Sequence, residues 1–159
     1  MPEGRARGTS NGLERSLRAK RAGEQSVRVF VLDESRLLAW MVGRLSPPGT
    51  EVVAFTSFDD ARRALLENPP DAAVVSLTSA HLPWREFRQL CAASRPPVPI
   101  LYESCVFSSA EEAGLEPGSG EARFLPAPAS RTNLKEAIER LLTDARGARE
   151  RAVFKGNLA

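Results

Sequence analysis

Short apolar runs alternate along this chain with segments in which apolar residues recur at helical spacing. The runs are bounded by turn formers, and they predict strands at residues 27–32, 51–55, 72–77, 98–102 and 122–125. The helical patterns predict helices at 37–45, 57–67, 84–93, 108–113 and from 130 to near 147. Five strands alternating with five helices favour right-handed crossovers and an α/β fold, a parallel sheet covered on both faces.

Capping residues support several of these helix starts. Ser57 or Thr56 can cap the second helix, and Ser130 can cap the last one. The predicted fourth helix has the weakest pattern, because the breaker segment Pro117–Gly120 follows it closely.

The third strand has the most continuous apolar pattern. Ala72–Leu77 follows two prolines and an aspartate, which suits a strand buried on both faces of a parallel sheet. Open α/β sheets bind ligands at the carboxyl ends of their strands. Ser76, a neutral alcohol, stands at that end of this strand.

Length and composition predict one domain flanked by tails. The 159 residues carry a net charge of +2 that is unevenly spread, with six basic and three acidic residues in 1–26 and four against one in 145–159. We therefore expect a disordered basic tail over 1–26, a folded domain over 27–144 and a basic C-terminal tail over 145–159. Solvated tails are a commoner use of such charge than binding to nucleic acid.

Several classes of protein are not expected. The sequence has neither a long apolar span nor a secretory signal, and we predict a cytoplasmic protein. Cys91 and Cys105 are too few for a disulfide framework, and with one histidine, His81, they do not make a zinc site. We expect His81 to lie in a solvent-facing loop.

Polar residues at three strand ends carry a family resemblance. Asp33 and Glu34 follow the first strand, Ser104 ends the fourth, and Phe124-Leu-Pro-Ala-Pro128 covers the fifth. With the element order, these features resemble the receiver domain of bacterial response regulators over residues 27–144. The resemblance implies a flavodoxin-like sheet of order 2-1-3-4-5 and an acidic pair at Asp33 and Glu34. It also implies switch positions at Ser104 and Phe124, and a cis bond before Pro128.

Two departures from that family decide the predicted chemistry. Ser76 occupies the position of the phosphoacceptor aspartate, and Ala127 that of the conserved lysine. Ala80 also replaces a proline that usually follows the acceptor. Phosphoryl transfer in this family needs a carboxylate nucleophile, Mg²⁺ and a cation. Asp33 and Glu34 could still hold a hydrated Mg²⁺ loosely, but without a reaction to serve, so we expect neither an enzyme nor a cofactor.

The sequence thus predicts a degenerate pseudo-receiver of the two-component or phosphorelay type that acts as a phosphorylation-independent protein-interaction module. The resemblance places its partner surface on the fourth helix, fifth strand and fifth helix, over Ser108–Leu115, Ala122–Leu125 and Ser130–Ala145. The partner would be another signalling protein, and a homodimer stays open. Trp40 and Trp84 are candidate anchors for a partner, and burial is an equal alternative for each.

Two other functions remain open at this point. An atypical but active receiver would need another acceptor, such as Glu103 beside Ser104. A nucleic-acid accessory protein would bind through its basic tails. The final segment Ala152–Leu158 resembles the opening of a domain often fused behind receivers, with a docking peptide or a frayed tail as alternatives.

Overall fold

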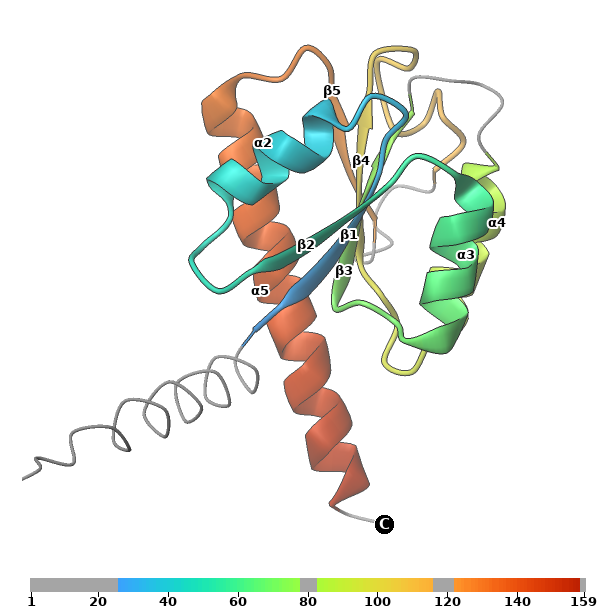
Figure 1. Ribbon diagram of the computed structural model, residues 1–159, viewed down its shortest axis with the longest axis vertical. Coiled ribbons are helices and arrows are strands. Elements are labelled where there is room, and N and C mark those ends of the chain that lie inside the picture. Colours follow the sequence, from blue (N-terminus) through green and yellow to red (C-terminus); the bar gives the residue numbers. More distant parts are fainter. Residues whose placement is uncertain (1–25, 78–82, 116–121, 158–159) are drawn as a thin grey trace, which may run out of the picture.

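The structure is a computed structural model that describes residues 26–77, 83–115 and 122–157. One parallel sheet of order β2-β1-β3-β4-β5 forms its centre, which confirms the predicted topology (Figure 1). The strands lie within one or two residues of their predicted bounds: β1 (Arg28–Leu32), β2 (Glu51–Phe55), β3 (Ala72–Ser76), β4 (Ile100–Ser104) and β5 (Ala122–Pro126). The helices are α2 (Leu37–Leu45), α3 (Phe58–Glu67), α4 (Trp84–Ala93) and α5 (Arg131–Gly156).

Helices cover both faces of the sheet. Figure 1 shows α2 and α5 on one face and α3 with α4 on the other. Alternate residues of β1 divide between the two layers, with Val29 and Val31 packed towards α2 and α5 and Phe30 and Leu32 towards α3 and α4. Every residue of β3 is buried, as expected for a central strand covered on both sides.

The two tryptophans have opposite environments. Trp84 is only 5% exposed, and its ring meets the Tyr102 ring edge-on with 5.6 Å between the centroids. Trp84 therefore belongs to the core, whereas Trp40 on α2 is 62% exposed. The thiols also differ: Cys91 is buried, which raises its pKa to about 12, and Cys105 is exposed.

The predicted fourth helix is wrong, because the structure has a single turn there. The Ala113 N–H donates to the Ser109 carbonyl, but the Leu115 N–H then donates to the Ala110 carbonyl. Gly114 lies between them with φ +75°, the left-handed conformation that ends a helix. The described residues thus contain four helices, and Gly114 stops the fifth before it can extend.

The last helix is longer than predicted. α5 continues past Gly147 to Gly156, so the predicted end near Gly147 is wrong. Arg149 explains part of the difference, because its Nε lies 3.1 Å from Oδ1 of Asp71 and one Nη donates to the carbonyl of Ser26. These contacts hold the helix beyond Gly147. They offset the cost of a glycine inside a helix, which is about 1 kcal/mol relative to alanine.

The predicted caps are confirmed at two helices. The Ser57 hydroxyl accepts the N–H of Asp60 at the start of α3, and the Ser130 hydroxyl accepts the N–H of Asn133 at the start of α5. The predicted N-terminal tail lies outside the described residues, except for Ser26, as do Ala80, His81 and Pro117–Gly120. None of the helices in the described part of the chain is both long and apolar enough to span a membrane.

Two glycine substitutions should change stability in opposite directions. We expect Gly114→Ala to lower the free energy of unfolding by about 1–2 kcal/mol, because alanine is strained at φ +75°. Gly43→Ala should raise it by about 0.5–1 kcal/mol, since Gly43 is helical and an added Cβ meets nothing within 4 Å. Urea unfolding measures both. Equal effects at the two positions would contradict the assignment of Gly114 as a helix stop.

Candidate functional site

Strand register places three polar residues side by side at the carboxyl edge of the sheet. Ser76 pairs with Glu103 on β4. Asp33 lies one residue beyond the pair formed by Leu32 and Val75, which sets it beside Ser76 on the neighbouring strand. Because side chains alternate along strands, all three lie on the face covered by α2 and α5. The sequence-predicted acceptor position and the first acid of the pair are thus brought together.

Ser76 is bonded to the acid beside it. Its buried hydroxyl donates to Oε2 of Glu103 at 3.3 Å. Burial raises the pKa of the Glu103 carboxyl above its ordinary value, the hydrogen bond from Ser76 lowers it, and the Asp33 carboxylate raises it. The environment therefore favours the neutral carboxyl more than water would.

Asp33 stabilises the start of α2. Its carboxylate is 5% exposed, and Oδ2 accepts the N–H of Leu38 at 3.0 Å and the hydroxyl of Ser35 at 2.9 Å. Oδ1 accepts the N–H of Ser35. Arg36, at the N-cap position, has φ 62° and makes no capping hydrogen bond with its side chain. The carboxylate of Asp33, three residues before Arg36, therefore caps the helix in its place.

The other predicted site residues lie around this row. Glu34 is exposed, and Ala127 is half-buried with its N–H donating to the carbonyl of Ser104 at 2.6 Å. The bond between Ala127 and Pro128 is cis, as predicted from the resemblance. Ala127, directly after β5, thus has a methyl group where the family resemblance implies the ammonium of a lysine.

The predicted switch residues have defined structural contacts. The Ser104 hydroxyl is fully buried, accepts the N–H groups of Val106 and Phe107, and donates to the carbonyl of Leu77 at 3.4 Å. Phe124 is half-buried against the core under α3 and α4. The sequence predicts both positions but neither the three hydrogen bonds of Ser104 nor the hydrogen bond from Ser76 to Glu103.

Solved structures of several bacterial signalling proteins are similar to this fold. The receiver domain of a modulated diguanylate cyclase from Desulfovibrio desulfuricans is 19% identical, with a TM-score of 0.57 over 77% of this chain and 98% of that one. The chemotaxis response regulator CheY4 of Vibrio cholerae is 18% identical, with a TM-score of 0.61 over 74% and 99%. The chain has the receiver fold.

A further structure and two negative results complete the comparison. The response regulator domain of Thermotoga maritima CheB is 21% identical, with a TM-score of 0.54 over 78% of this chain and 96% of that one. No protein-family model matches the chain, and no curated protein matches it either. The likeness therefore rests on three-dimensional structure and establishes the fold.

The donor groups at this edge of the receiver fold do not fit a tightly held Mg²⁺. This ion needs near-octahedral oxygen ligation anchored by carboxylates. The Asp33 carboxylate already accepts three hydrogen bonds, Glu34 is exposed, and position 76 offers a neutral hydroxyl. Within the described ranges, no three side chains of histidine, cysteine, aspartate or glutamate form a group that could hold a metal ion.

The capping role of Asp33 can be tested by unfolding. We expect Asp33→Ala to lower the free energy of unfolding by about 2–3 kcal/mol, because two amide groups and one hydroxyl lose their acceptor at a buried site. Asp33→Asn keeps one acceptor oxygen and should cost about 1 kcal/mol. Glu34→Ala is the matched control on the exposed neighbour. A cost for Asp33→Ala no larger than that of the control would contradict the capping role.

The environment of Glu103 makes a second prediction. NMR titration of the side-chain carboxyl should give a pKa above 4.5, raised further in Ser76→Ala, which loses the hydrogen bond, and lowered in Asp33→Asn, which loses the nearby charge.

The raised pKa of Glu103 should also change how stability depends on pH. A carboxyl whose pKa is higher in the folded than in the unfolded protein adds to the free energy of unfolding below its unfolded-state pKa. This contribution is lost as the pH rises through the folded-state pKa. Glu103→Gln should therefore gain stability relative to the parent as the pH rises above 4.5.

Proposed function

We propose that this protein is a signalling domain of the two-component type that does not accept a phosphoryl group and acts as a phosphorylation-independent protein-interaction module. The observation that carries the proposal is the hydrogen bond between Ser76 and Glu103. The hydroxyl at the acceptor position is engaged with a neighbouring acid, and Ala127 supplies no cation opposite it. We assign Ser76 as the acceptor-equivalent position and Ala127 as the lost lysine position.

Electrostatics at the site oppose phosphoryl transfer to Ser76. A transferred phosphoryl group brings negative charge on three oxygens, which metal ions and cationic side chains normally offset. Asp33 and Glu103 lie beside Ser76 and are both acids, and position 127 holds a methyl group. An incoming phosphoryl donor would meet acidic groups where it needs positive charge.

The energetic cost of losing the aspartate at position 76 depends on whether the lysine at position 127 is lost as well. A buried ammonium at position 127 without an aspartate at position 76 would be poorly paired, and an aspartate without the lysine would add a third acid to Asp33 and Glu103. Losing both avoids each penalty, and the remaining hydroxyl bonds to Glu103. This arrangement supports a site that has given up phosphoryl chemistry as a unit.

We assign the partner surface to the turn at 108–115, β5 and the part of α5 over 130–145. β5 is fixed to α5 by an ion pair in which Nη2 of Arg123 lies 2.8 Å from Oδ2 of Asp144. Val106, which precedes the turn, is 48% exposed and offers an apolar contact. The partner on this proposal is another signalling protein in the bacterial cytoplasm or a second copy of this chain.

One observation favours an active, atypical receiver as the second candidate function. Glu103 lies on the same face as Asp33 and Ser76, so its carboxylate is an alternative acceptor. Its raised pKa works against this role, because the neutral carboxyl is the poorer nucleophile. The absence of a cation at position 127 applies to this acceptor as well.

Phosphorylation from acetyl phosphate with Mg²⁺ tests the proposal. Intact-mass spectrometry of the unmodified protein should find no phosphorylated species, and beryllofluoride should leave the amide shifts near Asp33, Ser76 and Ser104 unchanged. The double variant Ser76→Asp/Ala127→Lys restores both missing groups and serves as the positive comparison. A stable, Mg²⁺-dependent phosphorylated form of the unmodified protein would refute the proposal. Its loss in Glu103→Gln would establish the second candidate instead.

A further inference from the structure

The last turns of α5 extend beyond the sheet. Figure 1 shows the helix continuing past the edge at which the strands begin, on the side away from the loops that follow the strands. The buried stripe of α5 ends at Ala145, and every residue from Arg149 to Gly156 is exposed. This part of the helix therefore has solvent on all sides.

The side chains in this part of α5 carry unpaired positive charge. Over 146–157 there are four basic residues and one acid. Three of the four, Arg146, Arg151 and Lys155, have no hydrogen bond or ion pair through their side chains within the described ranges. Their charges are thus free to meet a ligand of opposite charge.

A second basic segment reaches the same end of the molecule. Residues 1–26 contain six basic and three acidic residues and lead into β1 through Ser26. The Ser26 carbonyl accepts a hydrogen bond from Nη1 of Arg149, 123 positions further along the chain. The N-terminal segment therefore joins the fold beside the exposed part of α5, and the two sets of positive charge are neighbours.

The rest of the domain has the opposite charge. Residues 27–144 contain twelve basic and sixteen acidic residues, so the net positive charge of the chain comes from the two segments at this end. A field that is uneven in this way attracts a polyanion to one end of a protein and repels it from the other.

We propose that the exposed part of α5 and the N-terminal segment together bind the phosphate backbone of duplex DNA without reading its sequence. Basic side chains that pair with phosphates release counterions, which supplies the free energy of such binding. The major groove of B-form DNA is about 12 Å wide and admits an α-helix. Arg146 and Arg151 point to different sides of α5, because they are five residues apart, and so can meet phosphates on both walls of the groove.

Other polyanions fit this end less well. A membrane surface needs an apolar face along the helix, but the exposed Val153 and Phe154 are adjacent in sequence and point about 100° apart. Single-stranded nucleic acid is held by stacking on aromatic side chains, and Phe154 is the one aromatic residue in either segment. Duplex RNA has a major groove too narrow for side chains to enter.

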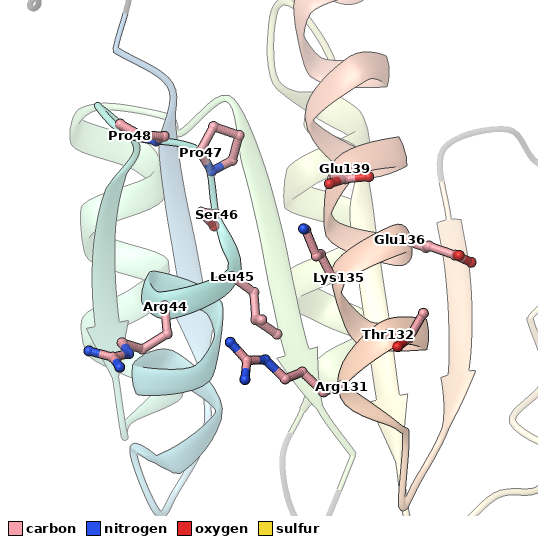
Figure 2. Close-up of a pocket in the computed structure, with 10 residues that line it drawn as sticks. All are labelled: Arg44, Leu45, Ser46, Pro47, Pro48, Arg131, Thr132, Lys135, Glu136 and Glu139. Carbon is pink, nitrogen blue, oxygen red and sulfur yellow. The ribbon is translucent and has the colours of Figure 1, made fainter.

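The start of α5 provides a control for charge on the same helix. Figure 2 shows Arg131 and Lys135 beside a groove that is also lined by the acids Glu136 and Glu139. Over 131–140 there are three basic residues against two acids, so the net charge is much smaller than at the other end of the helix. DNA should therefore not bind there.

This surface goes beyond the proposed function and does not depend on it. Ser76 and Ser104 lie at the carboxyl edge of the sheet, whereas the contact between Arg149 and Asp71 lies at the amino edge, just before β3. Failure to bind DNA would leave the proposed loss of phosphoryl transfer untouched, and phosphorylation at the other edge would leave DNA binding untouched.

Fluorescence anisotropy of the full chain with labelled DNA tests the proposal. Two duplexes of about 20 base pairs and unrelated sequence should bind within about twofold of each other, because phosphate contacts carry no sequence information. Affinity should fall by about tenfold or more between about 50 and about 200 mM salt, the loss expected for two or more phosphate contacts. A single strand, an RNA duplex and vesicles of phosphatidylserine and phosphatidylcholine should each bind about fivefold more weakly or worse.

Paired substitutions on α5 locate the contact. Arg151→Ala/Lys155→Ala should weaken binding of both duplexes by about tenfold and lower the slope of log Kd against log salt by about two. Arg131→Ala/Lys135→Ala removes the same charge from exposed positions at the start of the helix and should weaken binding less than about threefold.

A third pair tests the N-terminal segment. Arg18→Gln/Lys20→Gln should weaken binding about as much as the pair near the end of α5. The urea midpoint of each variant should stay at that of the parent, so that charge and not folding is measured. The proposal is overturned if the control pair weakens binding as much as Arg151→Ala/Lys155→Ala, or if the N-terminal pair has no effect. Equal binding of the single strand, the RNA or the vesicles, or no binding of either DNA duplex at the lower salt, also overturns it.

Discussion

Buried polar groups at the carboxyl edge of the sheet must find partners inside the protein, and this constraint determines the site. Helices cover β1, β3 and β4 on both faces, so a polar side chain at the end of each strand is shielded from water. A buried donor or acceptor left unpaired costs about 1–3 kcal/mol. Asp33, Ser76 and Ser104 each meet this requirement with neighbouring groups of the chain.

The bonds that satisfy these groups also limit what the edge can do chemically. Asp33 is occupied by the start of α2, and Ser76 by Glu103. A reactive centre needs groups that are held in place yet directed at a substrate. Here the oxygen atoms are directed at one another and at the backbone. The proposed loss of phosphoryl transfer is therefore expressed in the hydrogen bonds that remain as much as in the two residues that are missing.

The sequence predicts the sheet well because its evidence is local. Apolar runs such as Ala72–Leu77 and helical spacing over 84–93 are enough to place the elements and their order. Long-range contacts are not visible in the sequence. The extension of α5 depends on Arg149 reaching Asp71, which is 78 positions earlier in the chain.

Local backbone conformations could also not be predicted from the sequence. Gly114 takes a left-handed conformation that stops a helix, yet helices also contain glycine, as Gly43 and Gly147 show. The predicted site positions have the same limitation. Register brings Asp33, Ser76 and Glu103 together, but which pairs form hydrogen bonds depends on side-chain geometry. The two tryptophans are an exception, because helical spacing puts Trp84 on the buried stripe with Phe87 and Cys91, whereas Trp40 lies off the stripe of its helix.

The position of Asp33 links the edge of the sheet to the outer surface. Its carboxylate fixes where α2 begins, and the start of a helix sets the direction in which every later side chain points. With that start, Leu38 and Val42 face the core, and Leu37 and Trp40 face outward. The carboxylate of Asp33 thus has a structural role that does not depend on phosphoryl chemistry. It holds α2 in the orientation in which Leu38 and Val42 pack on the sheet.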